Sequence, residues 1–456
     1  MSSWAVRVIR NRYVDSVRLM QVAQVVRGHD GVSRAEVAMG TAANLAALGV
    51  SCDATPTDVV IAVQGGGDGA LDAAEAELAA PPASNGVAVA DPPRSLLGAR
   101  ANVALISLPG EYAVLEAHRA LTMGMHVFLF SDHVSAADEV ELKRRAVERG
   151  LLVMGPGCGT AMLGDVGLGF ANVVRSGSIG IVAAAGTGAQ EAAILLDGTG
   201  IGVSQIIGVG GRDLSADVGG IMFAEAMRML AADDATETLL LVSKPPSASA
   251  VASLGDIDVG GKRVVAAFVG WDGAAAPFEI YSTLDAGAFA AAGVEAPMFD
   301  ADVRGSGRLL GLFSGGSLAH EAMTVLTPAL GSIGGNAGDG SDDGHVIYDL
   351  GEEEYTQGRP HPMVDLEVRL RMLEEADAGC VLLDVVIGHG SHADPAGGLA
   401  PALARLAKDR PVIAHVCGTP ADPQDSRRQE ATLREAGVIV APTNAAAARL
   451  AGRALA

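Results

Sequence analysis

Basic residues are scarce in this chain of 456 residues. It has 32 lysines and arginines against 54 aspartates and glutamates, which gives a formal net charge of −22. Binding to nucleic acid needs clustered positive charge, so this balance excludes nucleic acid as a partner. Small anions are not excluded, because they respond to local fields. Aromatic residues are also few, at 4%, while hydrophobic residues make up 49% and glycines number 59. This composition is typical of a globular α/β protein packed with small aliphatic side chains.

Cysteine and long apolar runs are rare too. The four cysteines, Cys52, Cys158, Cys380 and Cys417, are scattered without the spacing of a metal site. We therefore expect a reduced, cytoplasmic protein with no metal and no cofactor. The first residues lack an apolar signal core, and no uncharged apolar run is long enough to span a bilayer. Together these absences predict a soluble protein with no membrane partner.

Strand-like and helix-like stretches alternate along residues 1–170. This alternation predicts a parallel, doubly wound, Rossmann-like sheet. Glycine-rich and proline-containing links then suggest two further domains, at residues 175–300 and 305–456. Residues 81–94 are expected to form a loop. Residues 331–345 have almost nothing to bury and should be a mobile insertion within the last domain.

A glycine turn stands at the centre of the sequence. The apolar run from Ile179 to Ala185 predicts a buried parallel strand, and Gly186-Thr187-Gly188 then leads into an alanine-rich helix. Thr187 and Gln190 have the spacing of a capping box, which would leave the helix N-terminus free to attract an anion. The alternative is an ordinary strand-to-helix turn of an α/β protein.

The same design occurs a second time, over residues 309–323. Gly316, Ser317, His320 and Glu321 stand at the places of Gly186, Thr187, Gln190 and Glu191. The downstream order repeats as well, with paired helices at 219–232 and 363–376 and paired strands at 239–243 and 381–386 and at 264–268 and 411–416. Two copies of one α/β unit are therefore predicted, each offering a helix N-terminus at the carboxyl edge of its sheet.

Two other motifs suggest chemistry at first sight. Cys158 lies in a glycine-rich loop without a neighbouring histidine, so a structural role is favoured over a nucleophile. His389, His392 and Asp394 suggest a metal site, but Ser391–Pro395 is better interpreted as a helix-entry loop with hydrogen-bonded histidines.

Three motifs resemble the α subunit of succinyl-CoA synthetase: Gly155–Cys158, Gly180–Glu191 and Val209–Asp213. Residues 309–440 resemble the C-terminal CoA-ligase domain of the β subunit of that enzyme. The resemblance implies an α/β protein with a Rossmann-like, CoA-binding-type domain followed by two flavodoxin-like, CoA-ligase-like domains. No ATP-grasp-like stretch is present, so the nucleotide-using part of a ligase is missing.

Four further motifs are similar to the FdrA family over nearly the full length. They are Met39–Asn44, Ser107–Tyr112, Gly351–Met363 and Gly388–Gly397. FdrA-like proteins carry an old acyl-CoA synthetase label, and the family includes a subunit of oxamate carbamoyltransferase that works with two other proteins. The resemblance therefore implies a transferase subunit in purine or ureide nitrogen catabolism, with two other protein subunits as partners.

Two departures from the synthetase bear on the mechanism. That enzyme carries phosphate on a histidine of the second α-subunit domain, whereas residues 271–277 of this chain contain no histidine. A phosphohistidine relay of that kind is therefore not expected. Lys244 stands where the synthetase pattern has a glutamate facing the phosphohistidine, and a lysine there favours a resident anion.

If the two repeats face each other as the synthetase domains do, both helix starts converge on one cavity that suits a phosphate dianion. The predicted phosphate-binding residues are Gly186, Thr187, Gly188, Gln190, Gly315, Gly316 and Ser317. We expect carbamoyl phosphate or phosphate there, beside an oxamate-like or ureide acceptor. The alternative is an NDP-forming acyl-CoA synthetase subunit that needs an ATP-grasp partner, and a third hypothesis is a non-catalytic scaffold.

The predicted catalytic side chains are Lys244, His320, Arg359 and His361. Arg359 would bind the carboxylate of the acceptor, and His361 would move a proton, unless His361 only caps the helix at 363. His320 either faces the cavity or caps its own helix.

The predicted substrate contacts are Arg212, His392 and Asp394, and for Arg212 an interface role is the other alternative.

Overall fold

The computed structural model describes residues 4–14, 16–80, 96, 99–273, 276–338, 340–341, 343–356 and 359–456. They form two compact units. Unit 1 comprises Met1–Ala99 and Glu353–Asp365, and unit 2 comprises Arg100–Glu352 and Leu366–Ala456. The loop predicted over residues 81–94 lies outside the described residues. Among the described residues, no helix is long and apolar enough to cross a bilayer.

Unit 1 is built on a small antiparallel sheet with the strand order β1-β3-β2. Its elements are β1 (Ala5–Ile9), α1 (Ser16–Arg27), β2 (Val32–Met39), α2 (Ala42–Leu48), β3 (Val59–Gly65), α3 (Gly67–Ala79) and α11 (Glu353–Thr356). One face of β3 packs on α1, where Val59, Ile61 and Val63 meet Val22 and Val26 in a closed core.

The parallel sheet predicted across residues 1–170 is therefore wrong for its first part. β3 lies between β1 and β2 and is antiparallel to both, so the strand-helix-strand pattern is split by a third strand. The order of strands and helices along a chain does not distinguish this split arrangement from a doubly wound one. The parallel expectation does hold for β4 (Val103–Ile106), β5 (His126–Leu129) and β6 (Val153–Met154), which pair in that order. The boundary proposed at residue 170 stays a prediction.

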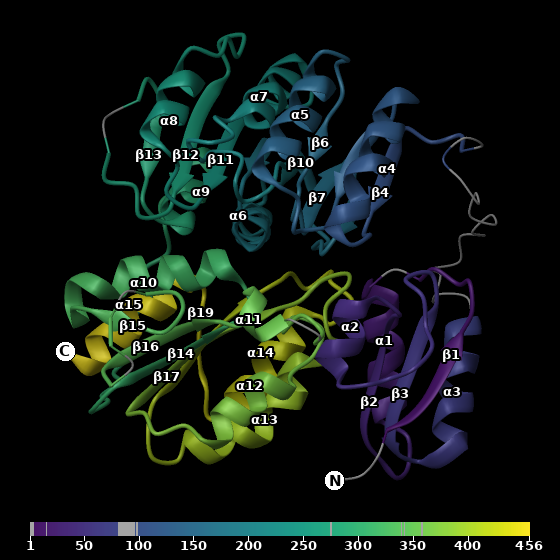
Figure 1. The fold of residues 1–456 in the computed structure, drawn as a ribbon. Coiled ribbons are helices and arrows are strands. Elements are labelled where there is room, and N and C mark those ends of the chain that lie inside the picture. Colours follow the sequence, from purple (N-terminus) through teal and green to yellow (C-terminus); the bar gives the residue numbers. More distant parts are fainter. Residues whose placement is uncertain are drawn as a thin grey trace. The chain divides into compact units, whose positions relative to one another are not determined.

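Unit 2 continues from these strands, with α4 (Gly110–Thr122) and α5 (Ala136–Val147), into the first repeat. The elements of the first repeat are β7 (Thr160–Leu163), β8 (Val166–Gly169), β9 (Ser176–Ala183), α6 (Gly186–Thr199), β10 (Val203–Gly208), α7 (Ile221–Ala232), β11 (Thr238–Ser243), α8 (Ala248–Gly255), β12 (Arg263–Phe268), β13 (Glu279–Tyr281) and α9 (Leu284–Ala292). They form a sheet in the order β13-β12-β11-β9-β10-β7-β8, in which only β7 and β8 run antiparallel to their neighbours. Figure 1 shows this sheet in teal with α6 along one side.

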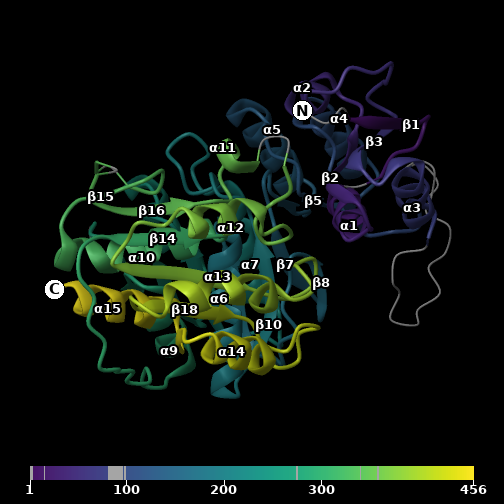
Figure 2. The same ribbon diagram turned by 90° about the horizontal axis from the view of Figure 1, so that it is seen from below.

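The second repeat has the same strand order. Its elements are β14 (Leu309–Phe313), α10 (Gly316–Leu330), β15 (Ile333–Gly334), β16 (His345–Asp349), α12 (Glu367–Glu374), β17 (Cys380–Val386), α13 (Pro395–Leu406), β18 (Val412–Cys417), α14 (Ser426–Glu435), β19 (Ile439–Ala441) and α15 (Asn444–Leu455). The all-parallel sheet β15-β16-β14-β17-β18-β19 can be followed from β15 to β14 in Figure 2.

The predicted internal repeat is confirmed. The order β10-β9-β11-β12-β13 in one copy corresponds strand by strand to β16-β14-β17-β18-β19 in the other, and both are the flavodoxin-like order. The central strands are buried on both faces, as β17 shows along its whole length. This burial explains why the sequence presents them as continuous apolar runs.

The segment expected to be a mobile insertion is partly built into this sheet. Ile333 is 3% exposed, and β15 pairs with β16. Asn336 fixes the end of β16, because its side chain donates to the Asp349 carbonyl and accepts from the Asp349 N–H, both at 2.8 Å. The prediction of a wholly mobile insertion is wrong for this stretch.

A buried cluster of charged groups joins the two repeats. Glu191 of α6 accepts from the N–H of Asn444 at the start of α15, and Glu321 of α10 accepts from the N–H of Leu284 at the start of α9. Each repeat therefore caps a helix of the other. Glu191 also lies 2.8 Å from His415 Nε2, and the Asn444 amide donates to Glu321. Glu191 and Glu321 are both 0% exposed.

This cluster makes the stability of unit 2 depend on pH. Burial, with Asp285 and Glu191 nearby, raises the pKa of Glu321 to about 8. Burial opposes the charged form of His415, but Glu191 raises the pKa of its imidazole above the usual value. Both groups have folded-state pKa values above their unfolded ones, so their stabilisation is complete at low pH and is lost as pH rises. Burial opposes the charged form of Asp285, but Arg449 holds the pKa of its carboxyl below the usual value. The stability that Asp285 contributes is therefore lost at a pH below the range in which Glu321 and His415 act.

We predict that the urea midpoint of unit 2 falls between pH 5 and pH 9. His415→Gln should make this fall smaller above the unfolded-state pKa of histidine, because the variant has no imidazole to deprotonate and only the contribution of Glu321 remains. Urea titrations at several pH values, with His29→Gln as the matched control, measure the effect. A midpoint that rises with pH over this range would contradict it.

Candidate functional site

The starts of α6 and α10 lie directly against each other. Thr187 Oγ1 accepts a long hydrogen bond of 3.4 Å from the Ser317 N–H. A Cβ atom on Gly315 would lie 2.8 Å from three atoms of Thr187, so only glycine permits this approach. The two glycine turns predicted to converge therefore do so. They meet in contact, and the cavity predicted between them stays a prediction.

On one side of the contact, three side chains surround the start of α10. Lys244 follows β11, Asp349 ends β16, and His320 lies one turn into α10. A Cβ on Gly316 would lie 2.3 Å from Asp349 Oδ2 and 3.4 Å from Lys244 Nζ, so both groups approach this glycine. No side chain caps α10. The first repeat thus contributes a cation to the helix start of the second.

Asp349 was missed by the sequence analysis. It is 5% exposed, and burial raises the pKa of its carboxyl to about 6, although Lys244 acts in the opposite direction. The only sequence signal for it was its place at the carboxyl end of a buried strand, next to Gly351. Its carboxylate accepts from the Gly351 N–H at 2.9 Å, and its backbone is held by Asn336.

His320 presents a free ring nitrogen. Its Nε2 is buried and has no hydrogen-bond partner in the described part of the chain. Burial and the Lys244 ammonium lower the pKa of His320, so the imidazole is neutral at pH 7. Its Nε2 lies close to Gly270, at the end of β12.

Gly315 does not have the predicted role of an anion donor. The N–H groups of Ser314 and Gly315 donate to Asp384, at 2.8 and 2.9 Å, and Arg369 pairs with the same carboxylate. An internal carboxylate therefore occupies the place where an anion would meet these two groups. The Ser317 N–H donates to Thr187 Oγ1, so the anion prediction for α10 is left to the N–H group of Gly316.

The start of α6 also differs from the sequence prediction. Its N-cap residue is Ala185, without a side-chain cap, so the predicted capping box between Thr187 and Gln190 does not form. Gln190 instead donates to Asn172 at 3.0 Å, and its Oε1 atom is buried without a partner. Tertiary contacts have replaced the local cap.

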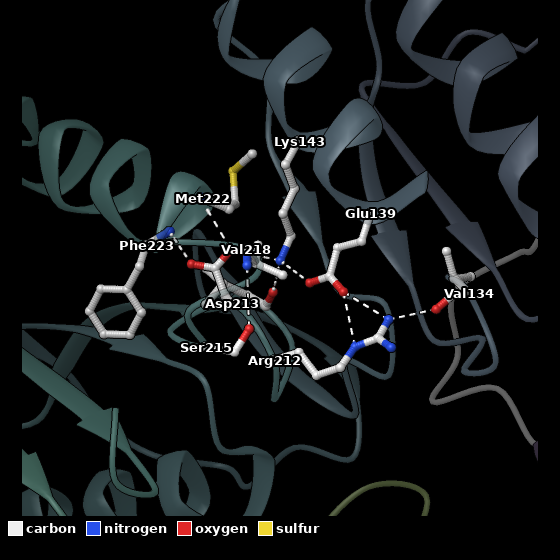
Figure 3. A network of polar contacts seen from close by, with 10 residues as sticks. Val134, Glu139, Lys143, Arg212, Asp213, Ser215, Val218, Met222 and Phe223 are labelled. Atoms are coloured by element: carbon white, nitrogen blue, oxygen red, sulfur yellow. Dashed lines mark hydrogen bonds and ion pairs between the residues drawn. The ribbon is translucent and has the colours of Figure 1, made fainter. Parts of the chain in front are cut away.

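Arg212, predicted as a substrate contact, is part of a buried ionic network that Figure 3 shows. Lys143 is 0% exposed and donates to Glu139 at 2.6 Å and to Asp213 at 2.7 Å. Arg212 pairs with the far side of Glu139 and donates to the Val134 carbonyl. Asp213 in turn accepts from the N–H groups at the start of α7. The network fastens α5 to the loop after β10, which is the interface alternative for Arg212. Its substrate role stays a prediction.

His392 and Asp394 form a helix entry, as the favoured interpretation had it. Asp394 is the N-cap of α13 and accepts from Gly397, and its own N–H donates to His392 Nδ1 at 3.0 Å. Burial lowers the pKa of His392. Cys158 is structural as well, because burial raises the pKa of its thiol to about 12 and keeps it protonated.

Arg359 and His361 belong to unit 1, so their catalytic roles stay predictions. His361 Nδ1 accepts from the Met363 N–H at 3.2 Å, and its carbonyl accepts from Val364 and Asp365. The histidine therefore closes a turn. The helix expected from residue 363 begins only at Glu367.

Comparison with known proteins places the chain in a family. It is 35% identical over 494 residues to the Uncharacterized protein YahF of Escherichia coli (strain K12), with 95% of each chain covered. Residues 312–454 match the CoA-ligase family. The chain belongs to the YahF family, which is succinyl-CoA synthetase-like. Residues 1–89 match the family described as "AllF, heavy metal-associated domain".

More distant relatives match part of the chain or only its fold. The mitochondrial succinate–CoA ligase [ADP-forming] subunit alpha-2 of Trichomonas vaginalis is 31% identical over 149 residues, which is 32% of this chain and 47% of that subunit. The chain thus spans about half the length of that relative. The dinucleotide forming acetyl-coenzyme A synthetase 1 of Ca. Korarchaeum cryptofilum, in its apo form, covers 79% of this chain and 84% of its own, at 14% identity and a TM-score of 0.33.

The residues of unit 1 do not fit a heavy-metal ion. Such ions are held by clustered thiolates or imidazoles, whereas residues 1–99 contain Cys52 as their single cysteine. Among the described residues, no group of three metal-ligating side chains comes together. The carboxylate of Asp58 is engaged internally, because it accepts from Asn11, Thr55 and Arg10.

We predict that Lys143→Met destabilises unit 2 by about 3–5 kcal/mol, because it leaves the buried Asp213 without a cation and Glu139 with only the half-exposed Arg212. Arg212→Met should cost about 1 kcal/mol or less, since the Arg212 side chain is 50% exposed. Urea unfolding of both variants measures the difference. Equal losses of unfolding free energy in the two variants would contradict the prediction that the buried Lys143 contributes more than the half-exposed Arg212.

Proposed function

We propose that this chain is a subunit of an acyl-CoA-ligase-type enzyme and that it moves an acyl group between orthophosphate and an acceptor at the start of α10. The supporting observation is the neutral His320, whose buried Nε2 has no hydrogen-bond partner among the described residues, next to the Lys244 ammonium and an uncapped helix start. All three features lie in or against the domain that matches the CoA-ligase family. They supply a base and an anion site in one place.

The proposed step needs no phosphorylated protein. The acceptor gives its proton to His320 Nε2 as its nucleophilic atom attacks the carbonyl carbon of an acyl phosphate. The bond from that carbon to the bridging oxygen breaks, and orthophosphate leaves with the electron pair. Lys244 and the N–H group of Gly316 stabilise the negative charge on the leaving phosphate. The Asp349 carboxylate lies beside Gly316 at the same helix start.

In the ligase form of this proposal the acceptor is a thiol, that of coenzyme A. The acyl phosphate comes from a partner subunit of ATP-grasp type, because the sequence of this chain contains no such stretch. The match to the CoA-ligase family over residues 312–454 supports this form.

A second candidate is an FdrA-type carbamoyltransferase. Here the acyl phosphate is carbamoyl phosphate, the acceptor is an amide or ureide nitrogen such as that of oxamate, and two other subunits complete the enzyme. Two observations favour it: residues 269–283 contain no histidine, and residues 1–89 match the AllF family. The chemistry proposed for Lys244 and His320 is the same in both forms.

Orthophosphate release by the protein, purified with the partners that accompany it, distinguishes the two forms. One reaction contains carbamoyl phosphate and oxamate without nucleotide, and the other contains ATP, coenzyme A and succinate. Release in the first supports carbamoyl transfer, and release only in the second supports the ligase. No release in either would contradict the proposal.

We predict that Lys244→Met lowers kcat/KM in the active assay by about 10²–10³-fold, the usual effect of removing a group that stabilises transition-state charge. Lys408→Met is the matched control, since Lys408 is an exposed lysine on the surface of unit 2. Equal activity of the two variants would show that Lys244 does not bind the phosphate.

A further prediction concerns pH. The lowered pKa of His320 means that kcat/KM should rise with pH through a midpoint below 6.5 and then reach a plateau. His320→Gln should lose about 10²–10⁴-fold in rate and the rising limb with it. Initial rates between pH 5 and pH 8 test this. An unchanged limb in the variant would assign the titration to another group.

A further inference from the structure

Unpaired buried polar atoms mark the junction of the repeats. Among the described residues, the buried side-chain atoms without a hydrogen-bond partner are Gln190 Oε1, His320 Nε2, Arg369 Nε and Ser391 Oγ. Gln190 and His320 occupy the same position in the two repeats, four residues after the first residue of α6 and of α10. An unpaired polar atom at both equivalent positions indicates a shared purpose, because buried polar groups are normally satisfied.

The surroundings of the two residues are also equivalent. His320 reaches the loops after β11 and β12 of the first repeat, where it lies close to Gly270. Gln190 bonds to Asn172, whose amide donates to the Ile387 carbonyl after β17 and to Asp422 after β18. Each helix start is thus completed by the carboxyl-edge loops of the opposite repeat. The His320 side holds Lys244, and the Gln190 side holds no cation among these contacts.

The chemistry on the Gln190 side combines donors with an acceptor. Gly186 is exposed at the uncapped start of α6, where free N–H groups suit a carbonyl or carboxylate oxygen. Gln190 is 1% exposed, and its Oε1 requires an N–H or O–H donor. Ser391 Oγ belongs to the loop that begins at Gly388, and a Cβ on Gly388 would lie 3.1 Å from the Asn172 amide.

We propose that Gln190, Ser391 and the start of α6 form a second ligand subsite that binds an amide group, an N–H donor beside a carbonyl or carboxylate oxygen. Gln190 accepts from the N–H, and the α6 N–H groups donate to the oxygen. This inference rests on the proposed function and assigns the two subsites: the cationic α10 side holds phosphate, and the α6 side holds the amide of the acceptor. The contact between Thr187 and Ser317 places the two subsites next to each other.

Ligand-observed NMR on the full chain tests this assignment without requiring turnover. The probes are acetamide and oxamate for the α6 subsite and orthophosphate, followed by ³¹P, for the α10 subsite. Gln190→Leu and Ser391→Ala should each weaken amide binding at least tenfold and leave orthophosphate binding within twofold. Lys244→Met should have the reverse effect.

Two matched controls separate the subsite from general damage. Gln205→Leu removes a glutamine whose Oε1 atom only accepts from Gly164, and Ser253→Ala removes an exposed hydroxyl. Both should bind every probe as the wild type does. Ser391→Ala removes a hydroxyl without a partner in the described structure, so its melting temperature without ligand should not fall.

The outcomes are distinct. Amide binding that is unchanged in both Gln190→Leu and Ser391→Ala overturns the subsite. Loss of orthophosphate and amide binding together in those variants also overturns it, because it indicates a structural role. If both probes bind as expected but no acyl transfer is measured, the subsite stands and the proposed function fails. If transfer occurs and the KM for the acceptor is the same in Gln190→Leu as in the wild type, the proposed function stands and the subsite fails.

Discussion

The exchange of buried carboxylates between the two repeats is the constraint on which the candidate site depends. Glu191 caps a helix of the second repeat and Glu321 caps a helix of the first, so neither repeat can complete its helices alone. These glutamates directly follow Gln190 and His320. The contacts that hold the repeats together therefore also fix the two residues to which we assign ligand chemistry. The same equivalence of the two repeats therefore accounts for the reciprocal helix caps by Glu191 and Glu321 and for the matching places of Gln190 and His320.

The charges around α10 explain why a cation is needed there. Asp384 and Asp349 both lie at the helix start, and either carboxylate alone would repel a phosphate. Arg369 neutralises Asp384 within the core, and that pair then serves as a cap. Among the described residues Asp349 makes no such ion pair, and its pKa of about 6 reflects the cost of burying its charge. Lys244 lies near this carboxylate and the helix start, so it offsets part of the local negative charge.

The sequence predicted those elements whose burial or turn geometry shows in the pattern of neighbouring residues. The strands of both repeats are buried on two faces, so their apolar runs were readable, and the glycine turns fixed where α6 and α10 begin. The position of β3 between β1 and β2 was not readable, because strand order leaves no local trace. The capping box failed for a similar reason, since Gln190 found a tertiary partner in Asn172.

The candidate site was predicted only in part, and the missed portion is long-range. Gly316, Ser317 and His320 lie at the helix start that the repeat predicted, and Lys244 lies near Gly316, but their ligand roles stay predictions. Asp349 escaped notice because a single aspartate at a strand end carries no motif. The partner of Arg212 is Glu139, 73 residues away, and that pairing depends on how α5 packs. The substrate-contact prediction used only the turn that contains Arg212, so it could not include a neutralising carboxylate from α5.

The central claim is direct transfer of an acyl group from phosphate, without a phosphorylated protein. Its most direct test uses carbamoyl phosphate labelled with ³²P, or ATP labelled at the γ-phosphate, with the protein and the partners that copurify with it. The protein is quenched in alkali during turnover, where phosphohistidine survives, and the label on this chain is counted. The account predicts that the label appears in orthophosphate and that none remains on the chain. Stoichiometric label on the chain that is lost in His320→Gln would contradict the account and make His320 a phosphate carrier rather than a base.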